Sequence, residues 1–312
     1  MILIDGVEIL TVQDGFTWGG ARDMCTRSLN FSILYNPLKE EIPKYKIAVG
    51  SKVEWIEKMP NNEGEQVDTT LFLGYVEEMP YNTDDDTISL TCQDFTTRLI
   101  RSKFIGRMKG TLNDLANNIC GSFNIKNGIN VENTHVHNIV STGDLSYYDV
   151  LKVACETMFK DQYTLYMNGD TLELATHDVV DNFEIGKNIR SSSFTQSISD
   201  MVTKVLILDN NGKIIDSVVD EENLQKFGLF QEVYSYNKDC KNNLAEAQKL
   251  LKGINNKGEI VVNNNNKCIS GRYIRIKEPV NNFVGVFEIQ SDNHTIGADS
   301  VMTLEVKDVP NG

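Results

Sequence analysis

The chain has 312 residues, and its 30 Lys and Arg against 44 Asp and Glu give a formal net charge of 30 − 44 = −14. Hydrophobic residues make up 40% and charged residues 24% of the chain, which is ordinary for a globular protein with its own core. The acidic balance argues against a general grip on nucleic acid and against docking on an anionic membrane surface.

Neither a membrane span nor a secretory leader is expected. The best apolar runs, such as residues 202–208, fall well short of the ~20 residues that a span needs. The chain starts MILIDG, without a basic stretch or a cleavage site. The six cysteines are scattered, so we expect reduced, partly buried thiols rather than a zinc knuckle or a redox pair. The chain is therefore expected to fold in a cytoplasm.

Residues 1–95 have the pattern of a series of strands. Asp5 and Gly6 form a two-residue turn signal between two short apolar runs, which predicts a hairpin. Residues 29–35 alternate apolar with polar side chains at a period of two. Further strands are expected at residues 52–57, 71–77 and 87–92, separated by polar loops at 61–68 and 82–86. Strands joined by turns at this spacing predict a small antiparallel barrel or sandwich.

Residues 96–187 change to a mixed pattern. A short helix is expected within residues 94–102. Two longer helices, at 111–123 and 146–159, each begin with a Thr or Ser that is followed three residues later by Asp and then by an apolar stripe. A hairpin within residues 163–175 completes a small α/β module.

Strands return in residues 188–312. The sequence DNNG at 209–212 predicts a hairpin, and two helices are expected at 220–227 and 239–252. A loop of four asparagines occupies residues 263–266. The chain closes with strand-like stretches at residues 272–276, 284–290 and 300–307.

No chemical site stands out. His135 and His137 point the same way on a strand and lie near Glu132, but a third metal ligand with suitable spacing is missing, His177 being the nearest histidine. The run of three aspartates at residues 84–86 lacks the spacing of a calcium loop. His294 is expected to satisfy a turn. No phosphate-binding glycine loop or nucleophile elbow occurs, so we expect no catalytic, cofactor or metal residues.

One aromatic stretch suggests an assembly interface. Phe16 and Trp18 belong to residues 16–21 (FTWGGA), which are flanked by glycines and are expected to lie between strands. Exposed aromatic residues are frequent anchors of protein interfaces. We therefore predict that Phe16 and Trp18 lie at an assembly interface, whereas Trp55, in an alternating strand, is expected in the core.

The layout resembles that of the baseplate hub proteins of contractile phage tails, the XkdQ/YqbQ group, with late control gene D proteins and the T-even phage hub as more distant relatives. Fold patterns along the whole chain, none of them a catalytic signature, carry this resemblance: residues 27–36 (RSLNFSILYN), 73–76 (LGYV), 88–95 (ISLTCQDF), 110–118 (GTLNDLANN), 145–153 (LSYYDVLKV), 168–174 (NGDTLEL), 245–251, 270–276 (SGRYIRI), 287–291 (FEIQS), His294 and 302–306 (MTLEV).

The resemblance implies a β-rich α+β fold with two small antiparallel β-barrels and an intervening α/β module. Residues 1–95 and 188–312 are the expected barrels and 96–187 the module, with 220–258 able to pack with that module. Family hubs are homotrimers, so three chains with two barrels each would join a hexameric tail tube protein to a central spike protein, beside other baseplate proteins. DNA would be passing cargo only, in a true phage, and no membrane binding is implied.

Alternatives remain open at the level of the sequence. The chain could be the hub or distal-tail protein of a non-contractile tail, which uses the same barrels. It could be a peptidoglycan hydrolase, because 44 acidic residues allow an unrecognised carboxylate pair. It could also be a free carbohydrate-binding module. We expect a non-enzymatic protein of a virion tail, baseplate or tail-like particle, made in the cytoplasm of the bacterial host.

Overall fold

The computed structural model divides into two compact units, residues 1–192 with 259–312 and residues 193–258, which are described separately. It describes the whole chain except residues 23, 37, 61–62, 83, 133, 160–162, 176–177, 239, 241, 281–282 and 310–312, and the side chain of Cys25.

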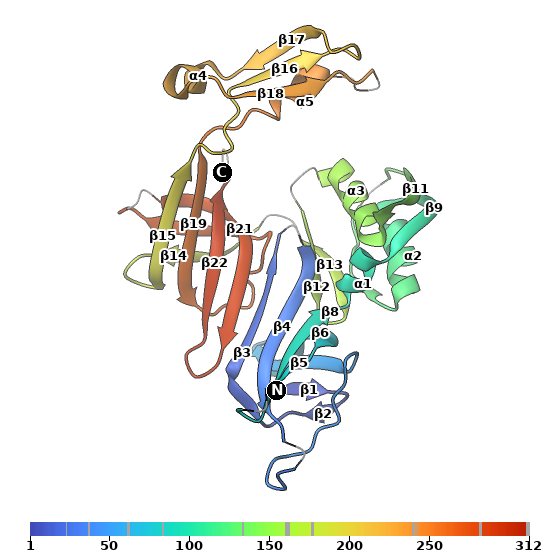
Figure 1. Cartoon of the computed structure of the whole chain (residues 1–312), viewed down its shortest axis with the longest axis vertical. Helices are drawn as coiled ribbons and strands as arrows, with labels where there is room; N and C mark the ends of the chain where they lie inside the picture. Colours follow the sequence, from blue (N-terminus) through green and yellow to red (C-terminus); the bar gives the residue numbers. More distant parts are fainter. Residues whose placement is uncertain are drawn as a thin grey trace. The chain divides into compact units, whose positions relative to one another are not determined.

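The first sheet is antiparallel and is built from the N-terminal strands (Figure 1). Its spatial order is β3-β4-β8-β6-β5-β1, with β2 beside β1 and β7 beside β8. The strands are β1 (Ile2–Ile4), β2 (Val7–Glu8), β3 (Val12–Ala21), β4 (Met24–Leu34), β5 (Lys52–Pro60), β6 (Gln66–Glu78), β7 (Tyr81–Asn82) and β8 (Thr87–Asp94).

The turn predicted at Asp5 and Gly6 is confirmed, because both residues adopt the left-handed backbone that a tight hairpin requires, with φ of 49° and 80°. Two other expectations were wrong. Residues 16–21 do not lie between strands but form the second half of β3. The loop expected at 61–68 is shorter, since β5 runs to Pro60 and β6 begins at Gln66; residues 61–62 lie outside the described part.

The interior of the first sheet is a single apolar cluster. Trp55 is its largest fully buried side chain, as predicted for a core residue. The rings of Phe16 and Trp18 lie edge-on to it, with centroids 5.0 and 5.3 Å away. Buried apolar residues from the remaining strands complete the cluster: Ile2, Ile4, Leu29, Phe31, Ile33, Val53, Phe72, Val76, Ile88, Leu90 and Cys92.

The middle of the chain contains helices as well as strands. Its elements are α1 (Thr96–Arg101), β9 (Lys103–Gly110), α2 (Leu112–Phe123), β10 (Lys126–Asn127), β11 (His137–Ser146), α3 (Tyr147–Phe159), β12 (Thr164–Asn168) and β13 (Thr171–Ala175). A reciprocal capping box between Thr111 and Asp114 starts α2, as its sequence predicted. The same pattern of bonds joins Ser146 and Asp149 at α3. The two-stranded ribbon of β9 and β11 was not predicted.

The second sheet contains the C-terminal strands and β14 and β15. The strands are β14 (Val179–Glu184), β15 (Ile189–Ser197), β19 (Asn255–Asn263), β20 (Tyr273–Glu278), β21 (Phe283–Ile296) and β22 (Val301–Asp308). Their spatial order is β15-β19-β22-β21-β20-β14. The distal part of β21 also pairs with β3, so both sheets form one continuous hydrogen-bonded path (Figure 1).

The two sheets have the same strand order. Apart from the two-residue strands β2 and β7, the first sheet uses β1, β3, β4, β5, β6 and β8, and the second uses β14, β15, β19, β20, β21 and β22. Numbered one to six along the chain, both read 2-3-6-5-4-1 in space. They differ at one end, because β1 runs antiparallel to β5 whereas β14 runs parallel to β20. The sequence has no short-period repeat, and two similar modules were expected only from its strand-rich ends and from the family resemblance.

Residues 193–258 form the smaller unit. A three-stranded sheet of β17 (Ile214–Val219), β16 (Lys204–Leu208) and β18 (Gln231–Ser235) packs Val205 and Ile207 against Ala247 of α5 (Asn243–Gln248). The hairpin around 209–212 is confirmed, and α4 (Glu221–Phe227) starts at the capping Asp220 as expected. The helix expected over 239–252 spans only residues 243–248 of the described part, and residues 239 and 241 lie outside that part.

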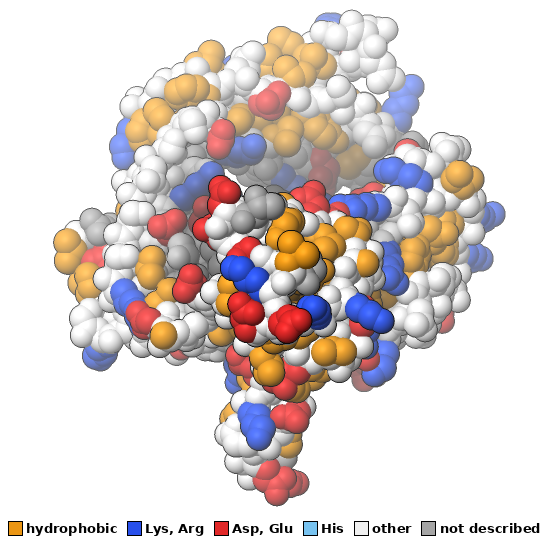
Figure 2. Space-filling view, turned by 60° about the horizontal axis from the view of Figure 1, so that its bottom comes forward, with side chains coloured by type: hydrophobic (Ala, Val, Ile, Leu, Met, Phe, Trp, Pro, Cys, Tyr) orange, Lys and Arg blue, Asp and Glu red, His pale blue; other side chains and the backbone are white. Residues whose placement is uncertain are grey.

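The chain is therefore a β-rich α+β protein with a large, mainly antiparallel sheet, which confirms the predicted fold class at that level. The described pairings leave the strand path open at β2 and β15. On the face in Figure 2, Lys and Arg side chains are interspersed with Asp and Glu rather than gathered into one basic field. None of the described helices has the length and apolar character needed to cross a bilayer.

Candidate functional site

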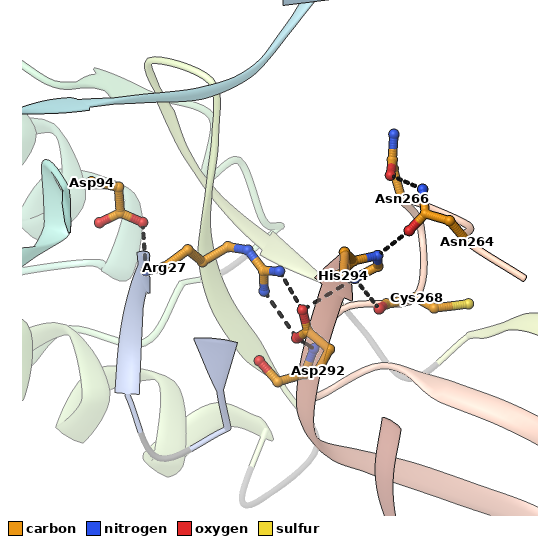
Figure 3. Close-up of polar contacts among 8 residues, drawn as sticks. Arg27, Asp94, Asn264, Asn266, Cys268, Asp292 and His294 are labelled. Carbon is orange, nitrogen blue, oxygen red and sulfur yellow. Dashed lines mark hydrogen bonds and ion pairs between the residues drawn. The ribbon is translucent and has the colours of Figure 1, made fainter. Parts of the chain in front are cut away.

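Buried and half-buried polar side chains gather where the first sheet meets the second (Figure 3). We call this cluster the seam, and its members are Arg27, Asp94, Asn264, Asn266, Asp292 and His294. Arg27 is on β4 and Asp94 ends β8, whereas Asp292 and His294 are on β21. The seam therefore joins segments that are 265 residues apart in the sequence.

The central contact of the seam is an ion pair between Arg27 and Asp292. Arg27 Nη1 donates to Asp292 Oδ1 at 3.0 Å, and Nη2 donates to Oδ2. Both residues are 4% exposed. The Arg27 guanidinium also lies over the Trp18 ring, 3.9 Å from its centroid. The two parallel hydrogen bonds to Asp292 fix the relative position of the two sheets at this point, and the Trp18 ring holds the guanidinium in place.

His294 extends the seam on the side of the second sheet. It is fully buried, and its Nδ1 lies 2.6 Å from Asn264 Oδ1. Its Nε2 lies 3.2 Å from both the main-chain oxygen of Cys268 and Asp292 Oδ2. The turn expected at His294 was therefore wrong, because this residue belongs to the long strand β21.

The asparagine loop connects the seam to the first sheet. Asn264 Nδ2 donates to Asn266 Oδ1 at 2.8 Å, and Asn266 Nδ2 donates to Glu57 of β5 at 3.0 Å. Asn265 donates to Asp181. The polar run that the sequence marks only as a loop therefore supplies side-chain bonds to three separate parts of the larger unit.

Two carboxyl groups of the seam are shifted in opposite directions. Burial raises the pKa of Asp94 to about 6, although hydrogen bonds from Thr96 and from the main-chain N–H of Arg27 act against the rise. Burial acts in the same sense on Asp292, but the charge of Arg27 and the hydrogen bonds to the carboxylate outweigh it and lower the pKa to about 2.

These shifts predict opposite effects on the pH dependence of stability. Because the pKa of Asp292 is lower in the folded chain, its stabilising contribution is complete above about pH 4 and is lost as pH falls through 2. Because the pKa of Asp94 is raised in the folded chain, burial of its ionised carboxylate destabilises the fold. This loss of stability is absent below about pH 4 and complete above about pH 6. An NMR titration that follows the carboxyl carbons is expected to show a midpoint above pH 3.8 for Asp94 and a midpoint below pH 3.8 for Asp292. Two unshifted midpoints would contradict this reading of the seam.

The seam has the features of a structural site. Asp94 is 1% exposed, and both of its oxygens already accept hydrogen bonds. A cavity of about 200 Å³ lies beside Trp18 and Asn266, but its described lining includes no Asp or Glu that could act as an acid or base. The geometry supports holding two sheets together rather than chemistry on a substrate.

The structure places the other candidate residues apart from the seam. His137 is buried on β11, with its ring 4.6 Å from that of His135, and burial and then His135 lower its pKa. The described residues contain no group of three metal-ligating side chains, and His177 lies outside them. Asp86 accepts bonds from Lys39 and Asn36 in a turn.

Trp18 and Phe16 occupy different environments from those expected of exposed anchors. Trp18 is only 4% exposed and contacts Trp55 and His294, and Phe16 packs against the same core. Their role in assembly stays a prediction. The residues of the seam were missed, since Arg27, Asp94 and Asp292 carry no local motif.

A family model described as YQBQ-like matches residues 16–307. No curated protein matches the chain. Among solved structures, the 43 kDa tail protein of prophage MuSo2 from Shewanella oneidensis is 15% identical, with a TM-score of 0.71 over 98% of this chain and 96% of that one. A tail protein from Neisseria meningitidis is 12% identical, with a TM-score of 0.68 over 98% and 95%. Prophage tail protein gp18 from Listeria monocytogenes is 13% identical, with a TM-score of 0.60 over 97% and 91%.

Proposed function

This chain belongs to the YQBQ-like family, and from that membership we propose that it is the structural baseplate hub of a phage tail or of a contractile phage-tail-like particle. As a trimer, it would join a hexameric tail tube to a central spike, and it would contact other baseplate proteins. It would perform no catalysis, and DNA would pass it only as cargo in a true phage.

The shared strand order of the two sheets is the observation that carries this proposal. Two sheets with the order 2-3-6-5-4-1 in each chain give three chains six related surfaces. Six related surfaces can meet a six-fold tube, while the three-fold axis of the trimer can meet a three-fold spike. A single sheet, or two unrelated ones, would offer no such match of symmetry.

The finer architecture follows from the same idea. We propose that each sheet curls into a small β-barrel, one in residues 1–95 and one in 188–312, with residues 96–187 as a module between them. The apolar side chains of β1, β3, β4, β5, β6 and β8 already converge on one interior, which supports a barrel-like curvature of the first sheet. Residues 198–254 would be an insertion between the second and third strands of the second barrel, β15 and β19.

Phe16 and Trp18 retain a role in this proposal, but an indirect one. Both lie on the half of β3 that pairs with β21. Trp18 stacks on the guanidinium of Arg27 and packs against His294. These residues would support assembly by keeping the two sheets in one rigid arrangement, which a ring of six alternating surfaces requires.

The proposal is tested by assembly with the tube and spike proteins. The purified chain, alone and with both proteins, is examined by light scattering, and the particles are examined by electron microscopy. We expect three copies at the junction of tube and spike, with or without a surrounding sheath. A chain that remains monomeric with both proteins present, or that clears peptidoglycan in a gel assay, would overturn the proposal.

A further inference from the structure

We propose that β15 of one copy pairs, as an added antiparallel strand, with residues 77–82 of a second copy of this chain. This inference rests on the proposed trimeric hub and names the contact that closes it. A joint of this kind already exists inside the chain, between β3 and β21.

The internal joint joins the second strand of one sheet to the fifth strand of the other. The first part of β21, residues 283–288, pairs with β20. β20 does not extend along the next part of β21, residues 291–296. On the same edge of β21, these residues pair with residues 16–21 of β3 instead. β3, the second strand of the first sheet, thus extends the second sheet. It does so along the stretch of β21 that β20, the fourth strand of the second sheet, does not cover.

The first sheet has the corresponding open stretch. Its fifth strand is β6, which continues into β7, and its fourth strand is β5. β5 pairs with β6 only as far as Tyr75, and main-chain bonds from residues 50–51 cover Val76. β8 pairs with the opposite edge of β6 and β7, as far as Asn82. Residues 77–82 are therefore the counterpart of residues 291–296.

The main-chain groups of this stretch are available for a further strand. The oxygen of Pro80 accepts a bond from the N–H of Ser89, so Pro80 faces β8. Alternation along an antiparallel strand then directs the N–H and C=O groups of Met79 and Tyr81 to the opposite edge. The missing N–H of Pro80 does not interrupt that edge, and the Tyr81 side chain is 45% exposed.

β15 is the matching second strand, and it ends the strand path. No described strand pairs with the edge of β15 that faces away from β19. Its sequence, IRSSSFTQS, has one charged residue and no proline, so it lacks the usual protection of an exposed edge. Ile189, the first residue of β15, forms an isolated bridge with Ile185, and no described strand is paired with the far side of β15 beyond it. Such a strand edge is suited to pairing with another chain.

A second copy is the occupant that fits both edges. Pairing β15 with the next copy's residues 77–82 repeats, between chains, the contact that β3 makes with β21 within the chain. The contact is head-to-tail, so each copy offers one edge and receives the other, and a ring closes when three copies have made it. Three internal and three external joints of the same kind would then alternate around the ring.

The substitution Tyr81→Pro tests this contact. Proline removes the N–H that points to the open edge, while the bonds that residues 80 and 82 make to β8 remain. The control Tyr81→Thr also loses the aromatic contact with Tyr35 but keeps the N–H. By sedimentation across a concentration series, we expect Tyr81→Pro to need at least about tenfold more protein to form the trimer than Tyr81→Thr, at unchanged monomer melting temperature.

Disulfide trapping supplies a second measurement. Chains carrying Tyr81→Cys together with a cysteine at one position from 191 to 195 are oxidised, and the register that pairs is expected to give a covalent trimer. A wild-type trimer that Tyr81→Pro leaves equally stable, with no trapped species at any position, would overturn this contact while leaving the hub intact. Failure of the wild-type chain to form a trimer in the presence of tube and spike would instead overturn the proposed function.

Discussion

A chain in which Arg27 is replaced by Met is expected to unfold with a free energy about 3–5 kcal/mol lower than that of the wild type. The substitution keeps a long side chain but leaves the buried carboxylate of Asp292 without its cation. A stability of about 5–15 kcal/mol is typical for a whole domain, so this loss is a large part of the total. Urea denaturation at pH 7, followed by far-UV circular dichroism, measures it.

Two further variants separate the buried pair from a general loss of charge. Combining Arg27→Met with Asp292→Ala removes both charges, so it should be less destabilising than the sum of the single substitutions. Arg190 pairs with Asp299 on the surface, where the two side chains are 39% and 75% exposed. Arg190→Met is expected to change stability little. Equal losses for Arg27→Met and Arg190→Met would refute the role assigned to the seam.

The substitution Gly19→Ala is expected to weaken the joint between the two sheets. A Cβ at this position would lie 2.4 Å from the main-chain oxygen of Asp292 and 3.2 Å from Cα of Asn293. The obstacle is backbone of the paired strand, so β3 and β21 must separate for the methyl group to fit. We expect a loss of about 3 kcal/mol, near the upper end of the usual cost of overpacking.

Hydrogen exchange distinguishes this effect from general destabilisation. In Gly19→Ala, the amides of residues 291–296 should exchange faster, while those of β16 in the smaller unit keep their protection. Gly121, on α2, has open space where its Cβ would be, so Gly121→Ala is a matched control that should stabilise the chain by up to ~1 kcal/mol. Unchanged protection of residues 291–296 in Gly19→Ala would show that the joint tolerates the methyl group.

Features encoded by neighbouring residues could be predicted from the sequence. The helices α2 and α3 begin where Ser or Thr precedes Asp by three residues, because that pattern satisfies main-chain groups at a helix start without help from distant residues. The hairpin of β1 and β2 follows in the same way from two residues that tolerate a positive φ. Such local signals also gave the β-rich α+β class.

The seam could not be predicted, and the reason lies in β21. The pairing of β21 with β22 shifts register between Ile289 and Ser291. This irregularity changes which side chains face inward. Before it, Phe287 and Ile289 are buried, and after it Asp292 and His294 are buried on the same face. Regular alternation would have placed both polar residues on the outer face, where they would need no partner.

The joint between β3 and β21 also has a consequence for how the chain is made. All strands of the first sheet have been synthesised once Asp94 has left the ribosome. Its outer strand β3 pairs with β21, however, and Asp292 of β21 lies 265 residues after Arg27. From Asp94 to Asp292 the ribosome adds 292 − 94 = 198 residues. At roughly 5–20 residues per second, that interval lasts about 10–40 s. During this time the nascent chain carries a formed sheet with an uncovered edge and an unneutralised Arg27. Translation speed and chaperone supply are therefore expected to affect the yield of folded protein, because an uncovered strand edge promotes aggregation.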